Sequence, residues 1–270
     1  MLVDWSPGYR EYAPPAALCA GVSCLWVRAV PAGEAGRAPV LPDGCADLIW
    51  QRGRGVFVAG PDTGPVPSAL APGTLFAGVR LRPGAGGPAL GMPLSALLDQ
   101  RVDAADLAGE AADGPVLDLA RLLPGWVTPD AAMRGLAGIA GRMVAAGPPD
   151  PLVVETASRL GSPRARVADV AADLGVSERH LYRRCRAAVG YGPATLRRVL
   201  RFRRFVSGID QTAVPPDLAR LATETGYADQ AHLTRETTCL AGLPPAALAR
   251  ARRHGRVQMT RSSDEETSWK

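Results

Sequence analysis

The C-terminal half contains two short stretches of side chains suited to hydrogen bonding with nucleic-acid bases and phosphates. The first stretch contributes Arg179, His180, Tyr182, Arg183 and Arg186, and the second contributes Gln230, His232, Thr234 and Arg235. A guanidinium can bond to O6 and N7 of guanine, and a carboxamide to N6 and N7 of adenine, with roughly 1–3 kcal/mol of discrimination for each pairing. Within the second stretch, Gln230 and Arg235 are the strongest candidates for such base contacts.

Both stretches lie inside one pattern that occurs twice, over residues 167–193 and 218–245. Each copy has a short helix with small apolar residues, a glycine turn, a polar capping residue, a second helix rich in polar side chains, and then Gly and Pro. This pattern is typical of a helix-turn-helix unit, whose second helix enters the major groove. Two units in tandem predict contacts with two successive major-groove segments on one face of a duplex.

The elements of each unit follow from glycine turns, capping residues and apolar spacing. In the first unit, we expect a supporting helix over residues 168–174 and a recognition helix from Glu178 to about Ala188. Gly175 forms the turn, Ser177 caps the recognition helix, and the inward positions are Leu181, Cys185 and Val189. In the second unit, Asp217 and Asp229 cap the two helices and Gly226 forms the turn. The inward positions of the recognition helix are Leu233 and either Thr237 or Leu240.

A third helix is predicted between the two units, over residues 194–206. Its apolar residues occur at helical spacing and are expected to face the units, so that the helix sets their relative orientation. Its basic residues are expected to point elsewhere, where they are available to phosphates; they are Arg197, Arg198, Arg201, Arg203 and Arg204. A solvated basic helix in a larger bundle is the alternative interpretation.

The charge of the chain is divided unevenly along its length. The net charge is +5 overall, with −3 in residues 1–150 and +8 in residues 151–270. A basic part joined to a mildly acidic part is typical of a nucleic-acid-binding domain fused to a domain with another role. No window of 18 residues is apolar and uncharged, which argues against a membrane span. We therefore expect a cytoplasmic, nucleoid-associated protein with reduced thiols.

We expect an α+β fold in two domains, with a mostly-β N-terminal domain and an all-α C-terminal domain. Strands are predicted over residues 18–30, 46–51, 56–59 and 74–82, separated by turns rich in Pro, Gly and Asp. The predicted divisions are a β domain at 1–114, a helical connector at 115–160, the double helix-turn-helix at 161–256 and a disordered tail at 257–270. The connector either forms a dimerisation surface or packs under the β domain.

Residues 165–253 resemble the double helix-turn-helix domain of AraC-family transcriptional regulators. The resemblance rests on both units, their order and the helix between them, including Gly175, Pro193, Gly226, Asp229 and Pro244. It implies that bases are contacted by Arg179, Tyr182, Arg183, Gln230, Ala231 and Arg235. Two departures from the family pattern are Cys185 and Thr237, which stand where the family has phenylalanine. Because the second unit departs further, over residues 236–239, we expect the first unit to carry more of the affinity.

The N-terminal segment resembles an uncharacterised domain that is fused to units of this kind, in phrases such as the Leu-Pro-Asp-Gly of residues 41–44. The resemblance implies a sensory or assembly role and a fold that could be cupin-like. Cupin-like sensory domains can hold a metal or a sugar, but the three histidines, His180, His232 and His254, all lie beyond residue 150. The N-terminal half therefore offers no imidazole for a metal site or a catalytic base, and we expect no metal, no cofactor and no catalytic residue.

Cysteine and charged residues leave two alternatives open in the N-terminal half. Cys19, Cys24 and Cys45 could bind zinc or sense oxidation, although no close pair supports this and small buried cysteines are common. Arg80 and Arg82 could bind an anionic effector, or they could pair with turn carboxylates, which are Asp43, Asp47 and Asp62.

These features predict a sequence-specific DNA-binding transcription regulator, without enzyme activity, whose N-terminal domain acts through an effector or through dimerisation. The expected partner is a double-stranded operator, with RNA polymerase, a small-molecule effector and a second copy of the chain as further candidates. The alternative is a cysteine-based sensor or repair enzyme, using Cys24 or Cys45, fused to a DNA-binding module.

Overall fold

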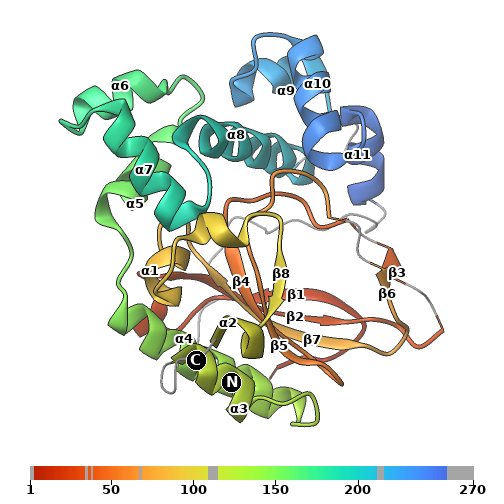
Figure 1. The fold of residues 1–270 in the computed structure, drawn as a ribbon. Helices are drawn as coiled ribbons and strands as arrows, with labels where there is room; N and C mark the ends of the chain where they lie inside the picture. The colour runs from red at the N-terminus through yellow and green to blue at the C-terminus, as the bar shows by residue number, and fades with distance from the viewer. Residues whose placement is uncertain are drawn as a thin grey trace.

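The computed structural model describes residues 3–33, 36–37, 39–66, 69–108, 115–211 and 216–253. These residues form an N-terminal antiparallel β domain and a C-terminal helical domain (Figure 1). The expected α+β fold with two domains is thereby confirmed. The tail predicted to be disordered, residues 257–270, lies outside the described residues.

The N-terminal domain is built on a six-stranded sheet in which all neighbouring strands are antiparallel. In spatial order the strands are β1 (Gly8–Tyr12), β2 (Val22–Ala29), β7 (Leu75–Leu81), β4 (Ala46–Gln51), β5 (Gly55–Ala59) and β8 (Arg101–Asp103). The four central strands agree with the predicted ones, whereas the edge strands β1 and β8 were not predicted. A separate two-stranded sheet pairs β3 (Gly36–Arg37) with β6 (Ala69–Leu70).

Alternation along the strands gives the sheet two different faces. On β4, Leu48 and Trp50 point into the apolar core, while Asp47 and Gln51 point to the opposite, polar face. On the polar face the Trp26 indole lies directly over Gly78, where an added β carbon would be 2.1 Å from its Cε2 atom. A glycine is therefore required at this position of β7.

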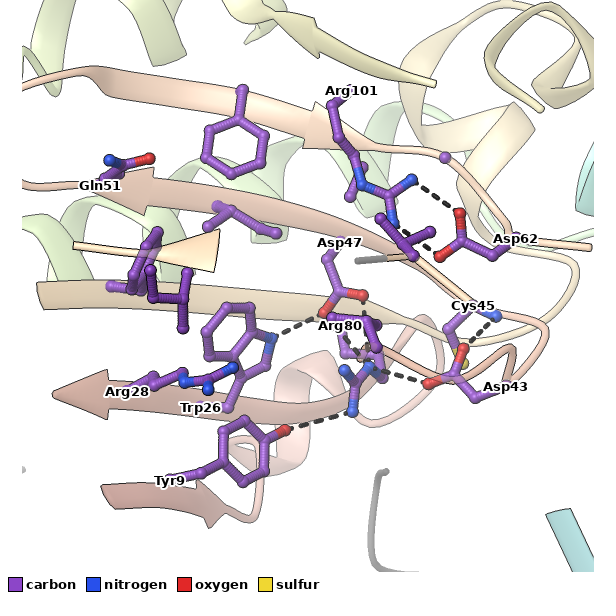
Figure 2. A pocket seen from close by; sticks show the side chains of 18 of the residues that line it. Tyr9, Trp26, Arg28, Asp43, Cys45, Asp47, Gln51, Asp62, Arg80 and Arg101 are labelled. Carbon is purple, nitrogen blue, oxygen red and sulfur yellow. Dashed lines mark hydrogen bonds and ion pairs between the residues drawn. The ribbon is translucent and has the colours of Figure 1, made fainter. Parts of the chain in front are cut away.

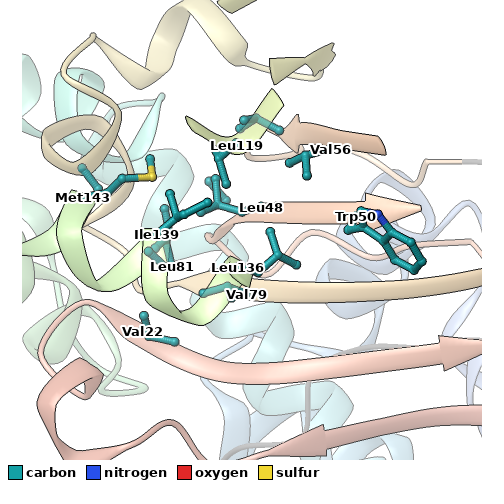
Figure 3. Close-up of a cluster of buried hydrophobic side chains, with 14 of the residues drawn as sticks. Val22, Leu48, Trp50, Val56, Val79, Leu81, Leu119, Leu136, Ile139 and Met143 are labelled. Carbon is teal, nitrogen blue, oxygen red and sulfur yellow. The ribbon is translucent and has the colours of Figure 1, made fainter. Parts of the chain in front are cut away.

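The apolar face of the sheet is covered by α4 (Pro129–Ala146), as Figure 3 shows. Met133, Leu136, Ile139 and Met143 of this helix are buried with the inward side chains of the central strands. Shorter elements close the domain: η1 (Ala16–Leu18), α1 (Gly86–Leu90), η2 (Leu94–Leu97), α2 (Ala104–Ala108) and α3 (Pro115–Leu122).

The C-terminal domain contains both predicted helix-turn-helix units. The first consists of α6 (Val167–Asp173) and α7 (Glu178–Val189), and the second of α9 (Leu218–Thr225) and α10 (Gln230–Ala241). The long helix α8 (Pro193–Asp210) runs between them and above the sheet in Figure 1, and α11 (Pro245–Arg253) follows the second unit. No helix in the described ranges is long and apolar enough to cross a membrane.

The predicted connector, residues 115–160, divides between two hydrophobic cores. Leu119 of α3 and the inner face of α4 belong to the core of the sheet, which favours the packing alternative for these two helices. In contrast, α5 (Pro151–Leu160) buries Val153 and Leu160 together with Leu181 of the first helix-turn-helix unit. The second unit has its own core around Phe202 and Phe205 of α8.

Thr237 provides a test of how the second core is packed. Its side chain is fully buried in α10, and its hydroxyl has no hydrogen-bond partner within the described ranges of the chain. Replacement by valine keeps the shape and removes the desolvation penalty of the hydroxyl, so Thr237→Val is expected to stabilise the fold by about 1 kcal/mol. Thermal unfolding should show a Tm higher by about 2–4 °C.

The matched control for this substitution is Thr238→Val on the same helix. The Thr238 side chain is exposed, and its hydroxyl donates a hydrogen bond of 2.8 Å to the Thr234 carbonyl. Removing it should leave Tm unchanged or slightly lower. An equal gain in both variants would show that helix propensity, rather than the buried hydroxyl, determines the effect.

Candidate nucleic-acid interface

The recognition helix α7 is positioned by a cap and by one buried face. The Ser177 hydroxyl accepts a hydrogen bond of 3.2 Å from the His180 amide, which satisfies a free N–H group at the helix start. Leu181, Cys185 and Val189 are buried as predicted. The opposite face therefore turns outward.

The outward face of α7 is cationic. Its exposed residues are Arg179, Tyr182, Arg183 and Arg186. The Arg183 guanidinium lies 3.3 Å from Nδ1 of His180, and Arg186 lies 6.0 Å from the centre of the Tyr182 ring. Among the described residues, no carboxylate forms an ion pair with any of the three arginines on this face. Their charge is therefore available to an external anion.

The second recognition helix, α10, is capped by Asp229, whose carboxylate accepts a hydrogen bond of 2.6 Å from the His232 amide. Gln230, Ala231 and Arg235 are exposed on it. The Thr234 hydroxyl instead donates to the Gln230 carbonyl at 2.8 Å, so it is engaged within the helix. Gln230, Ala231 and Arg235 of the predicted set thus lie exposed on α10, whereas Thr234 and His232 are engaged within the protein.

His232 is directed toward the protein rather than outward. Its ring stands edge-on to Tyr227 with centroids 5.3 Å apart, its Nδ1 accepts from the Ala228 amide, and its Nε2 lies 3.4 Å from Oε1 of Glu236. The contacts given by the structure make His232 a positioning residue for the turn before α10. Sequence reasoning placed it among the polar side chains available to DNA.

The interunit arginines are not all available to phosphates, contrary to the prediction. Arg201 is buried, forms an ion pair with Glu236 at 2.6 Å and lies 4.8 Å from the Tyr227 ring centre. Arg204 donates to the backbone carbonyls of Gly161 and Thr225. The physical reason is that α8 lies in the middle of the bundle, so its polar face also meets the ends of neighbouring helices. Glu236, which departs from the family pattern, is the partner that holds α8 to α10.

A pocket of about 400 Å³ opens on the polar face of the sheet (Figure 2). It is lined by β1, β2, β4, β5, β7 and β8 and by the loops at residues 40–45 and 60–66. Its volume lies in the range of small-molecule sites. Four of the charged residues considered in the sequence line this one cavity: Asp43, Asp47, Asp62 and Arg80.

Arg80 is the centre of the ionic cluster in this pocket. It is buried and lies 3.2 Å from carboxylate oxygens of Glu11, Asp43 and Asp47. Asp47 also accepts a hydrogen bond of 2.7 Å from the Trp26 indole. With three carboxylates around one guanidinium, burial outweighs the attraction of Arg80 and raises the pKa of both Glu11 and Asp47. The structure thus supports pairing, rather than anion binding, for Arg80.

Asp62, which lines the pocket, and Arg82, which does not, have different partners from those considered in the sequence. Asp62 forms a bidentate pair with Arg101, at 2.7 and 2.6 Å, and burial raises the pKa of Asp62. Arg82 donates to the carbonyls of Cys19 and Val22 and so does not pair with an aspartate. Arg101 was missed because its strand, β8, is only three residues long.

The cysteines show no arrangement suited to chemistry. All five are free thiols, and Cys24 and Cys45 are buried. Burial raises the pKa of both thiols well above the ordinary value, so the reactive thiolate is disfavoured at neutral pH. In the described part of the chain, no group of His, Cys, Asp and Glu could hold a metal ion. The alternative of a cysteine-based sensor or repair enzyme therefore gains no support.

One loop of the pocket wall contacts both recognition helices. At the C-terminal end of α7, a β carbon added to Gly190 would lie 2.6 Å from Cγ of Pro61. At the end of α10, one added to Gly242 would lie 3.4 Å from Cγ of Pro65. The second pocket loop also reaches the C-terminal domain, because Leu41 belongs to the core around Phe202. The pocket and the two recognition helices therefore share these loops.

Comparisons with known proteins divide the chain in the same way. Residues 170–251 match a family described as a helix-turn-helix domain, and residues 10–103 match a domain of unknown function, DUF6597. The C-terminal region is an AraC-type helix-turn-helix domain. The matched range contains α7, α8 and α10 and thus every residue of the candidate interface.

No curated protein matches the chain. Among solved structures, ToxT from Vibrio cholerae O395 is similar at 10% identity, with a TM-score of 0.42, over 83% of this chain and 95% of that one. ToxT bound to (E)-4-(8-methylnaphthalen-1-yl)but-3-enoic acid is similar at 9% identity, with a TM-score of 0.45, over 90% of this chain and 98% of that one.

The excess of carboxylates around Arg80 predicts a pH-dependent stability. The pKa of Glu11 is raised in the folded state. The contribution of Glu11 to the free energy of unfolding is therefore fully present below its ordinary pKa of 4.5 and is lost as pH rises through the raised value. Glu11→Gln, which keeps an acceptor for Tyr9 and Arg80, should raise Tm at pH 7 by about 2–4 °C, for about 1 kcal/mol. The difference from the native protein should shrink toward pH 4.

Thermal unfolding of both proteins between pH 4 and pH 8 measures this effect. Glu155→Gln is the control, because Glu155 pairs with Arg159 on an exposed helix surface. A Glu11→Gln variant that is less stable than the native protein at pH 7 would show that attraction to Arg80 outweighs burial.

Proposed function

We propose that this protein is a sequence-specific DNA-binding transcription regulator whose N-terminal domain modulates how the AraC-type domain binds DNA. The observation that carries the proposal is the pair of capped recognition helices with exposed polar faces. Arg179, Arg183 and Arg186 on α7 and Gln230 and Arg235 on α10 are exposed on helices whose other faces are buried. Such faces suit the major groove, where arginine and glutamine read base edges.

Affinity in this proposal comes mainly from phosphate contacts. The basic C-terminal part carries +8 in residues 151–270, against −3 in the remainder. Neutralising phosphates releases counterions, so binding should weaken steeply as salt concentration rises. The first unit exposes three arginines on its recognition helix and the second exposes one, which supports a larger contribution of the first unit to affinity.

The N-terminal domain is proposed to act on DNA binding through an effector held in the pocket or through a second copy of the chain. The loop from Pro61 to Pro65 lines the pocket region and contacts the ends of α7 and α10. A ligand that displaces Asp62 or Val66 would move these contacts. If the ligand binds more tightly when the loop is displaced than when it is in its present position, ligand binding would change the affinity of the protein for DNA.

Binding to duplex DNA tests the proposal. A bound sequence is first selected from a random duplex library with the full chain, and its affinity is then measured by fluorescence anisotropy. Arg183→Ala and Arg235→Ala should each lose roughly 1–3 kcal/mol of binding free energy, which corresponds to about fivefold to 150-fold in Kd. The loss is expected to be larger for Arg183→Ala.

The control is Arg134→Ala, since Arg134 is an exposed arginine of α4 in the N-terminal domain. This variant should bind DNA with native affinity. A protein that selects no sequence, or whose affinity does not change between 50 and 200 mM salt, would contradict the proposed function. A larger loss at Arg235 would contradict only the ranking of the two units.

A further inference from the structure

The charges of the pocket are balanced at one end and unbalanced at the other. Arg80 and Arg101, toward the C-terminal domain, are paired with carboxylates. Arg28 lies farther along the same face, because in the β2–β7 ladder Arg28 is opposite Phe76 whereas Arg80 is opposite Cys24. In Figure 2 its guanidinium lies beside Trp26, away from Asp43 and Asp62. It is therefore the pocket arginine that stands apart from the ionic cluster.

Arg28 has no counter-ion among the residues that the structure describes. Its half-buried side chain makes no ion pair or hydrogen bond with a carboxylate, and the ionisable group that acts on it is the neutral Tyr9 phenol. Burial lowers the pKa of Arg28 to about 10, so the side chain remains charged at neutral pH. A partly desolvated cation without a partner is unfavourable, and an anion brought by a ligand would relieve this cost.

The neighbouring Arg54 does not compete for this role. Its guanidinium pairs with Asp103 at 2.7 Å and stacks on the Phe57 ring at 4.2 Å from the centroid. The other residues that line this end of the pocket are mostly apolar, namely Trp26, Ile49, Leu70 and Phe76, with Gln51 and Thr74 as the polar ones. One cation within an apolar wall matches a ligand with one negative charge and an apolar body.

We propose that this pocket binds a small organic monoanion, with its anionic group on the Arg28 guanidinium and its apolar body against Ile49, Leu70 and Phe76. A planar guanidinium can hold a carboxylate or sulfonate through two parallel hydrogen bonds. The role of such a ligand as the effector rests on the proposed function, but its binding does not. The paired arginines and aspartates at the other end then serve as the floor of the pocket.

Two fluorescent probes with similar apolar bodies test the proposal on the full chain without DNA. They are 8-anilinonaphthalene-1-sulfonate, which carries one negative charge, and N-phenyl-1-naphthylamine, which is neutral. Arg28→Gln should weaken binding of the anionic probe by about tenfold or more, because a charge-assisted contact is lost. Binding of the neutral probe should be unchanged. Arg28→Lys, which keeps the charge but not the bidentate geometry, should give an intermediate Kd.

Arg52→Gln is the matched control, because Arg52 is exposed in the turn after β4 and does not line the pocket. It should bind both probes with native affinity. Native affinity of Arg28→Gln for the anionic probe would overturn the proposal. An equal loss of both probes would also overturn it, since that loss would reflect the apolar wall rather than the charge. Tm is measured for each variant, and Arg28→Lys provides the charge comparison should Arg28→Gln not fold.

The outcome is independent of the test of DNA binding. A protein that binds the anionic probe through Arg28 but no DNA sequence would contradict the proposed function and leave this site standing. A protein whose DNA binding depends on Arg183, but whose probe binding is unaffected by substitution of Arg28, would support the proposed function and contradict this site.

Discussion

The two-residue alternation of the central strands is the constraint on which the rest of the structure depends. It sends Leu48, Trp50 and Val79 to α4 and sends Asp47, Arg80 and Trp26 to the other face. Burying charged side chains on that face is tolerated because arginines and carboxylates meet there at 2.6–3.3 Å. A shift of one residue in register would move the apolar side chains to the pocket face and the charged ones to the core. The same register is therefore required for both the apolar core and the ionic pocket. The pocket is thus a direct consequence of the pairing that forms the core.

In the C-terminal domain, helix caps and contacts between helices determine how the elements are arranged. Caps at Ser177, Asp217 and Asp229 determine where three helices begin, and the ion pair of Arg201 with Glu236 holds α8 to α10. The pair is nearly buried, so removing one partner would leave an uncompensated charge, whereas the pair itself contributes mainly to a defined arrangement. Residues that look suited to DNA in the sequence are therefore of two kinds: exposed ones on α7 and α10, and buried ones that orient those helices.

Local signals predicted much of this arrangement. The strand at Ala46–Gln51 was predicted to the residue because Asp47, Ile49 and Gln51 alternate with Ala46, Leu48 and Trp50. The turns at Gly175 and Gly226, both with positive φ, followed from their place between two apolar periodicities. Edge strand β8 was not predicted because three residues are too few to show a periodicity. The Arg101–Asp62 pair was therefore not predicted either. The pairing of Arg201 with Glu236 joins segments distant in the chain, for which composition and spacing contain no signal. The same holds for the absence of a carboxylate partner for Arg28 among the described residues.

The loop between Pro61 and Pro65 has a consequence for how the protein meets a duplex. Each proline restricts its own backbone, and each lies against the carboxyl-terminal end of a different recognition helix. Through this one loop the β domain contacts the ends of both recognition helices. In the proposed DNA-binding function, the separation of the two recognition helices along a duplex would then depend partly on the β domain.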